Sequence, residues 1–190
     1  MLQNILIGLA GVVVLFLAIV ATRPSAYEVE RKVEIAAPAD LVFGVLHDLH
    51  RFGGVFVLFG SPLDELDSNL QKTFEGPAAG VGQSYAWSGA NAGVGKLTIE
   101  ESVPGLRVGL KLEFLKPMAS TATCALTIEA GPTGSRVTWS MKGHHNFVGK
   151  AFGLFVNMDK MLGGDIEKGL GRLKVVTEAS TSSPSTLTPS

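Results

Sequence analysis

The first 22 residues are almost entirely apolar. They hold 17 residues of the types Met, Leu, Ile, Ala, Val and Phe, and no charged side chain. Residues 5–22 would span about 27 Å as a helix, close to the hydrocarbon thickness of a bilayer. The pattern predicts an uncleaved single-pass membrane anchor over residues 1–22. A cleaved signal peptide and a buried soluble helix are the alternatives, although the start lacks basic residues and Ile19 stands where cleavage after Ala21 would need a small residue.

Beyond the anchor, apolar and polar residues alternate. Tyr27, Val29, Val33 and Ile35 share one face at period two, which predicts a half-buried strand over 27–35. Pro38 and Asp40 suit the first turn of a following helix, whose apolar stripe is Leu41, Val42, Val45, Leu46 and Leu49. Six further strand patterns, separated by turns rich in Gly and Pro, cover residues 70–76, 83–89, 94–102, 106–115, 120–130 and 135–143.

A second helical pattern closes the domain. Asn146 is suited to cap a helix over 147–176, in which apolar residues recur every three, four or seven positions and Gly163-Gly164 marks an expected bend. Residues 177–190 are rich in Ser, Thr and Pro, and we expect a disordered tail there. The predicted organisation is an anchor (1–22), a linker (23–26), one domain (27–176) and the tail (177–190).

The order of these elements predicts an α+β fold, because a run of antiparallel strands followed by one amphipathic helix places the helix across one face of the sheet. The inward face carries the apolar residues of each strand, including Tyr85, Trp87, Trp139 and Met141, and the outward face is polar. Residues 52–60 are an apolar segment bounded by glycine. This segment is predicted either to cover the core, as a loop or extra strand, or to act as a lid or membrane-dipping patch.

Composition narrows the function classes. The chain is 46% hydrophobic and 17% charged, and its net charge of −1 gives no electrostatic reason to expect a nucleic-acid partner. A single cysteine, Cys124, excludes a disulfide scaffold and is expected to be a buried thiol. Arg23, Arg31 and Lys32 follow the anchor and no basic side chain precedes it, which weakly favours a cytoplasmic domain but leaves the side unresolved.

Several motifs together resemble a known family. Residues 27–38 (YEVERKVEIAAP), 74–77 (FEGP), 85–87 (YAW), 136–139 (RVTW) and 152–165 (FGLFVNMDKMLGGD) are similar to the SRPBCC superfamily, also called START-like or polyketide cyclase/dehydrase and lipid transport. The resemblance implies a helix-grip fold, in which a seven-stranded curved antiparallel sheet wraps around the long C-terminal helix. The segment 51–60 departs from the Trp- and Pro-containing stretch that relatives often carry there.

The resemblance also implies a cavity between sheet and helix that holds a hydrophobic small molecule or lipid. The residues expected to line it are Phe43, Tyr85, Trp87, Leu112, Phe114, Leu126, Trp139, Met141, Leu154 and Met158. From the residues alone, a solid core is the competing interpretation. The anchor over 5–22 would hold the domain beside a bilayer, where such ligands partition.

Three side chains are candidates for acid–base chemistry in such a cavity, namely Asp159, Asp165 and His144. Each is also compatible with an exposed position at the margin of its element. The histidines His47, His50, His144 and His145 lack the convergent ligand spacing of a metal site, so we expect neither a metal nor a cofactor. The hypotheses are thus a hydrophobic-ligand or lipid binder, a cyclase, hydratase or hydrolase, and a protein-interaction module with a closed core. The oligomeric state is left open.

Overall fold

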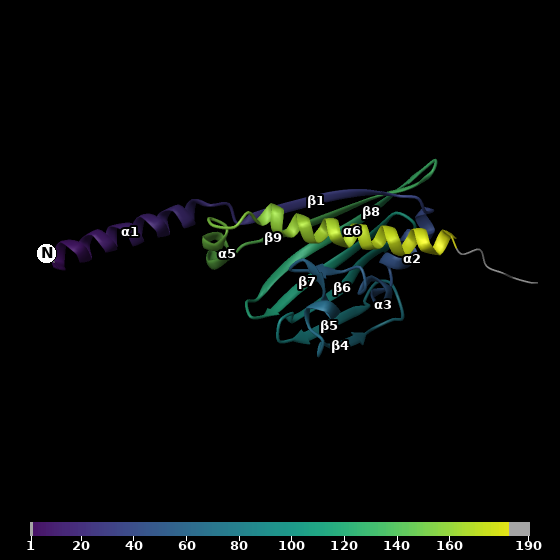
Figure 1. The fold of residues 1–190 in the computed structure, drawn as a ribbon, viewed down its shortest axis with the longest axis horizontal. Helices are drawn as coiled ribbons and strands as arrows, with labels where there is room; N and C mark the ends of the chain where they lie inside the picture. Colours follow the sequence, from purple (N-terminus) through teal and green to yellow (C-terminus); the bar gives the residue numbers. More distant parts are fainter. Residues whose placement is uncertain (1, 183–190) are drawn as a thin grey trace, which may run out of the picture.

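The computed structural model describes residues 2–182. The chain forms an N-terminal helix that projects from the domain, a seven-stranded antiparallel sheet, short helices and a small hairpin between its first two strands, and a long C-terminal helix (Figure 1). The helices are α1 (Leu2–Thr22), α2 (Ala39–Leu46), α3 (Leu49–Phe52), α4 (Leu63–Leu66), α5 (Phe147–Phe152) and α6 (Met158–Ser182). The strands are β1 (Ala26–Ile35), β2 (Val57–Leu58), β3 (Ser61–Pro62), β4 (Gln71–Glu75), β5 (Ser84–Gly89), β6 (Gly93–Val103), β7 (Arg107–Lys116), β8 (Ser120–Gly131) and β9 (Gly134–His144).

The main sheet has seven strands in the order β1-β9-β8-β7-β6-β5-β4, all neighbours antiparallel. The α+β fold predicted from the order of elements and the helix-grip architecture implied by the family resemblance are both confirmed, and each predicted strand is present with ends shifted by no more than one residue. Positive φ angles at Gly105 and Gly134 form the tight turns after β6 and β8, in backbone conformations that glycine adopts without strain.

Helix α6 lies across one face of the sheet (Figure 1). Ile166, Leu170 and Leu173 are buried on its inner side, at the spacing expected of an amphipathic helix. Between them, Gly169 lies directly against the Trp139 ring, so that an added Cβ would come within 2.8 Å of that ring. Helix and sheet are therefore in close contact at the level of Trp139.

The apolar segment 52–60 closes the core from one side. Phe52, Val55 and Phe56 are fully buried, and Val57 and Leu58 form one strand of a small hairpin with Ser61–Pro62. Only Phe59 points outward, at the tip of that hairpin. Of the two interpretations of this segment, the structure shows the core-covering one with an extra strand.

The C-terminal helical region corrects two expectations. The predicted continuous helix over 147–176 is two helices, because α5 ends at Phe152 and α6 begins at Met158. The helix does not break at Gly163-Gly164. It also extends to Ser182, so residues 177–182, expected in a disordered tail, are helical; Thr177 is buried and its hydroxyl donates to the Leu173 carbonyl. Residues 183–190 of the expected tail lie outside the described residues.

Helix α1 projects away from the domain at the edge where β1 begins (Figure 1). Residues 3–22 form a helix that is long and apolar enough to cross a membrane, and its side chains are almost wholly exposed. Val20 is the exception, because α5 packs against the last turns of α1 and buries it. One end of the domain therefore combines the end of α1, helix α5, the start of β1 and the end of β9. We call this the anchor end.

Candidate functional site

A recess of about 580 Å³ opens at the anchor end, between the start of β1, helix α5 and the joint that leads into α6. Its lining combines the first residues after α1 with residues from the joint: Arg23, Pro24, Ala26, Tyr27, His145, Gly149, Lys150, Gly153, Leu154, Phe155, Val156 and Asn157. The larger apolar side chains of this lining are Tyr27, Leu154, Phe155 and Val156. The two basic side chains are not matched by any acidic one among these residues.

The inner wall of the recess is an aromatic pair. The Tyr27 ring stacks on His145 with ring centres 4.5 Å apart. Tyr27 also covers Gly143 on β9, where a side chain of any size would collide with it. Burial raises the pKa of Tyr27 and lowers the pKa of His145, so at neutral pH both are uncharged. The Tyr27 hydroxyl makes no hydrogen bond to another described residue, which leaves it available to a ligand.

Two asparagines create the joint. The Asn146 side chain accepts a hydrogen bond from Gly149 N at 2.8 Å and caps α5, as predicted. The Asn157 side chain accepts from Lys160 N at 3.0 Å and starts α6 anew. Because an Asx cap at Asn157 competes with helical continuation, residues 153–157 leave the helix and form one side of the recess.

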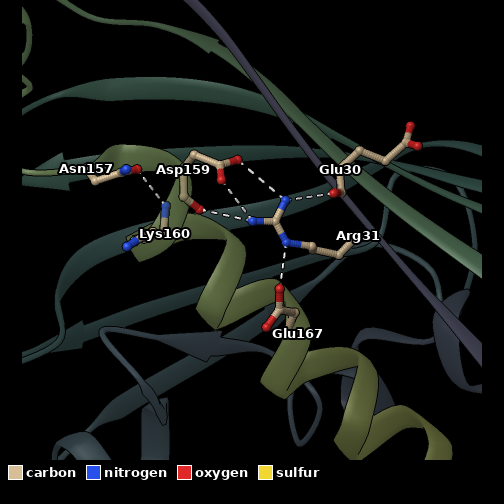
Figure 2. Close-up of polar contacts among 6 residues, drawn as sticks. All are labelled: Glu30, Arg31, Asn157, Asp159, Lys160 and Glu167. Atoms are coloured by element: carbon tan, nitrogen blue, oxygen red, sulfur yellow. Dashed lines mark hydrogen bonds and ion pairs between the residues drawn. The ribbon is translucent and has the colours of Figure 1, made fainter.

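A charge cluster ties the first turns of α6 to the sheet (Figure 2). Arg31 on β1 donates to Asp159 Oδ2 at 3.0 Å and to Glu167 Oε1 at 2.6 Å. These hydrogen bonds raise the pKa of Arg31. Gly163 faces the same guanidinium, and an added Cβ there would collide with it. Gly163 therefore allows Arg31 to approach the helix closely, and it does not mark the bend that the sequence predicted.

Most side chains predicted to line a central cavity come together. Tyr85, Trp87, Leu112, Leu126, Trp139 and Met141 are all buried on the inner face of the sheet, and Phe43 and Phe114 are half-buried and pack against this core. Leu154 is half-buried in the lining of the recess instead. Met158 begins α6, and its side chain is not described. The centre of this cluster is occupied by Phe52 and Phe56.

Two rings from the segment 52–60 fill the space between helix and sheet. The ring centre of Phe52 lies 5.6 Å from that of Trp139, and the ring centre of Phe56 lies 5.9 Å from that of Trp87. Trp87 in turn packs on Gly95 and meets Phe114 edge-on. At this depth the aromatic side chains pack against one another, and the recess lies beyond them, toward Met141 and Leu154.

The three candidate acid–base groups, Asp159, Asp165 and His144, do not face a common cavity. Asp159 is largely exposed and paired with Arg31. Asp165 accepts hydrogen bonds from Phe59 N at 3.0 Å and Gly60 N at 2.7 Å, and so holds the hairpin tip between β2 and β3. Burial raises the pKa of Asp165, and those two hydrogen bonds act in the opposite direction. His144 is exposed at the end of β9. The structure does not bring these groups together, and their catalytic roles stay predictions.

The recess was not visible in the sequence. Alternation predicts the inward face for Tyr27, but its proximity to the joint depends on the pairing of Ala26 with His144. Asn157 was the available signal, because Asn three positions before a helical Lys160 is a usual start of a helix. Phe52 and Phe56 belong to an apolar segment without periodicity, so the sequence does not show that both rings enter the core.

Comparison with known proteins agrees with this fold. The profile of the family described as polyketide cyclase / dehydrase and lipid transport matches residues 26–178. None of the curated proteins matches the chain. The di-domain ARO/CYC StfQ from the steffimycin biosynthetic pathway superposes with a TM-score of 0.62 at 10% identity, over 84% of this chain and 53% of its own.

Two other solved structures align with this chain over nearly the whole of their own length. A protein from Mesorhizobium loti gives a TM-score of 0.57 at 14% identity, over 81% of this chain and 98% of its own. Major latex-like protein 151 from Panax ginseng gives 0.55 at 12% identity, over 80% and 98%. At these identities the likeness shows the fold alone.

Proposed function

Because this chain belongs to the polyketide cyclase/dehydrase and lipid transport family, we propose that it binds a hydrophobic small molecule or lipid at the surface of a membrane in which α1 anchors it. The observation that carries the proposal is the recess of about 580 Å³ beside the last turn of α1. A molecule leaving the bilayer along α1 would meet this recess first.

The lining of the recess supports a ligand with a long or broad apolar part. Leu154, Phe155 and Val156 offer aliphatic and aromatic surface, and Tyr27 adds a ring with a free hydroxyl. Met141 and Phe114 lie at the same end of the core, and we propose that the deepest part of the ligand points toward them. The similarity in fold to StfQ, a di-domain ARO/CYC from a biosynthetic pathway, is compatible with a bulky ring system as well as an acyl chain.

The packed aromatic core decides where the ligand lies. Phe52 and Phe56 occupy the centre between α6 and the sheet, so a ligand could enter that space only by displacing them. Filled cores resist such displacement, because each buried ring contributes several kcal/mol. The ligand-binding role predicted for Trp87 and Tyr85 would therefore be that of a supporting wall, and direct contact is proposed for Leu154 and Met141.

Photo-crosslinking of the full chain tests the proposal. The chain is reconstituted in lipid nanodiscs with a diazirine-labelled fatty acid, irradiated, and digested for mass spectrometry. We expect labelled peptides from residues 23–27 and 145–157. Leu154→Trp fills the recess and should reduce this labelling at least tenfold, whereas Leu106→Trp, at an exposed position of the β6–β7 turn far from the recess, should not. Labelling confined to α1, or equal labelling of both variants, would contradict a ligand in the recess.

A further inference from the structure

Unpaired positive charge on this molecule gathers at one place. The structure describes all sixteen Lys and Arg side chains. Most of them meet a carboxylate or a backbone carbonyl. The side chains without such a partner among the described residues are Arg23, Lys116, Lys150 and Lys160.

These four positions belong to the anchor end although they are far apart in the chain. Arg23 follows α1, Lys150 lies on α5, and Lys160 lies in the first turn of α6. Lys116 ends β7 at the same end of the sheet, because Ser120 at the start of β8 pairs with Phe114, and Ala122 pairs with Gly143 near the end of β9. The carboxylates nearest to this end are already engaged, Glu28 with Lys142 and Asp159 with Arg31.

Exposed apolar side chains surround these cations. They are Leu115 and Met118 beside the β7–β8 turn, and Phe147, Val148, Phe152 and Phe155 on α5 and the joint. Phe155 is 80% exposed, and apart from Phe59 every strongly exposed phenylalanine in the described domain lies here. Exposed aromatic groups mixed with unpaired lysines, next to the end of an apolar helix, match the chemistry of a bilayer interface with anionic headgroups.

We infer that the anchor end of the domain is a second membrane-binding surface, which docks on anionic lipid headgroups and holds the mouth of the recess against the bilayer. The cations would contact the headgroups, and the phenylalanines would enter the boundary between headgroups and acyl chains. The inference rests on the proposed role of α1 as a membrane anchor and goes beyond it, since a tether alone would leave the domain free to tilt and rotate.

Fluorescence quenching by lipid measures this docking in the full chain. A bimane probe is attached at Met118→Cys, while Cys124 is buried and should not react. A matched probe at Leu106→Cys reports the β6–β7 turn at the opposite end, where the side chain is also apolar and exposed. The chain is reconstituted in vesicles of phosphatidylcholine alone, or with about one third phosphatidylserine, each containing lipid that carries a nitroxide quencher.

We expect quenching of the Met118→Cys probe in the anionic vesicles, weaker quenching in neutral vesicles or in about 0.5 M NaCl, and none at Leu106→Cys in either. Each lysine near an anionic surface contributes roughly fivefold, so Lys116→Gln, Lys150→Gln and Lys160→Gln together should shift the docking equilibrium by about 100-fold. The control set Lys32→Gln, Lys168→Gln and Lys174→Gln changes the net charge equally but lies away from the anchor end, where Lys32 is level with Thr138, Lys168 donates to the Gly60 carbonyl and Lys174 donates to the Glu34 carbonyl. It should leave docking unchanged.

Three results would overturn the inference: equal quenching of both probes, quenching that is the same in neutral and anionic vesicles, or equal effects of the two lysine sets. A carbonate wash of the same vesicles separates this from failure of the anchor. A chain that stays in the vesicle pellet without quenching refutes the docking surface alone. A chain that washes off refutes the anchor and, with it, the docking surface.

Discussion

The packed centre of the domain can be tested by removing one ring. Phe52 is fully buried, and its ring centre lies 5.6 Å from that of Trp139 and 6.2 Å from that of Phe56. Replacing a buried phenylalanine by alanine costs about 3–5 kcal/mol, from lost burial and from the space left behind. At about 2–4 °C per kcal/mol for a domain of this size, Phe52→Ala should lower Tm by roughly 6–20 °C.

The assay follows the fluorescence of Trp87 and Trp139 in the full chain, held in a mild non-ionic detergent, through thermal unfolding. Both indoles belong to the ring cluster and report its loss directly. Phe155→Ala is the matched control, since it removes the same atoms from a side chain that is 80% exposed. Surface substitutions of this kind change stability by no more than about 0.5 kcal/mol.

The result decides between a packed core and an open cavity at this depth. If Phe52→Ala costs less than about 1 kcal/mol and behaves like Phe155→Ala, the ring is not packed and the interpretation is refuted. A large cost has a further consequence that can be checked. An apolar space of this kind binds benzene, so saturating benzene should raise Tm of Phe52→Ala and leave the unsubstituted chain unchanged.

Two further predictions concern single buried groups. Burial raises the pKa of the Cys124 thiol to about 12, so at pH 8 a thiol reagent should label it only through unfolding, and labelling of the native chain within minutes would contradict this placement. Hydrogen bonds from Asn91 N and Asn69 N hold the pKa of Asp67 below its ordinary 3.8. The ionised Asp67 therefore stabilises the fold above that pH, and this stabilisation is lost as pH falls through the lower native pKa. Asp67→Asn should lower Tm at neutral pH and flatten its fall in acid, and parallel curves of Tm against pH for the two chains would contradict it.

The strands were predictable because each carries its own evidence. In β9, Val137, Trp139 and Met141 alternate with polar residues, and Gly134 marks the turn that precedes them. Such signals are local, so a strand can be predicted from them without knowing which strand it pairs with. The family resemblance then supplied the arrangement of these strands around α6, which alternation alone does not determine.

The roles of the acidic candidates could not be predicted in the same way. In the sequence, Asp159 and Asp165 lie near the apolar side of a helix, a position that suits a cavity-facing acid as well as a structural contact. Their partners are remote in sequence, 128 residues away for Asp159 with Arg31 and 106 for Asp165 with Phe59 N. Only the packing of α6 against β1 and the β2–β3 hairpin determines which environment each carboxylate has.

The break between α5 and α6 shows how a small local choice determines the site. Apolar residues continue through Leu154 and Phe155 at spacings that fit one long helix, so periodicity favours continuity. The cap that Asn157 makes with Lys160 N favours a new start instead. With a continuous helix, residues 153–157 would not form the turn beside Tyr27, and α5 would not lie against the end of α1. Both the recess and the proposed contact with the bilayer depend on this break, so the feature that hydrophobic patterning misses is the one on which the proposed function depends.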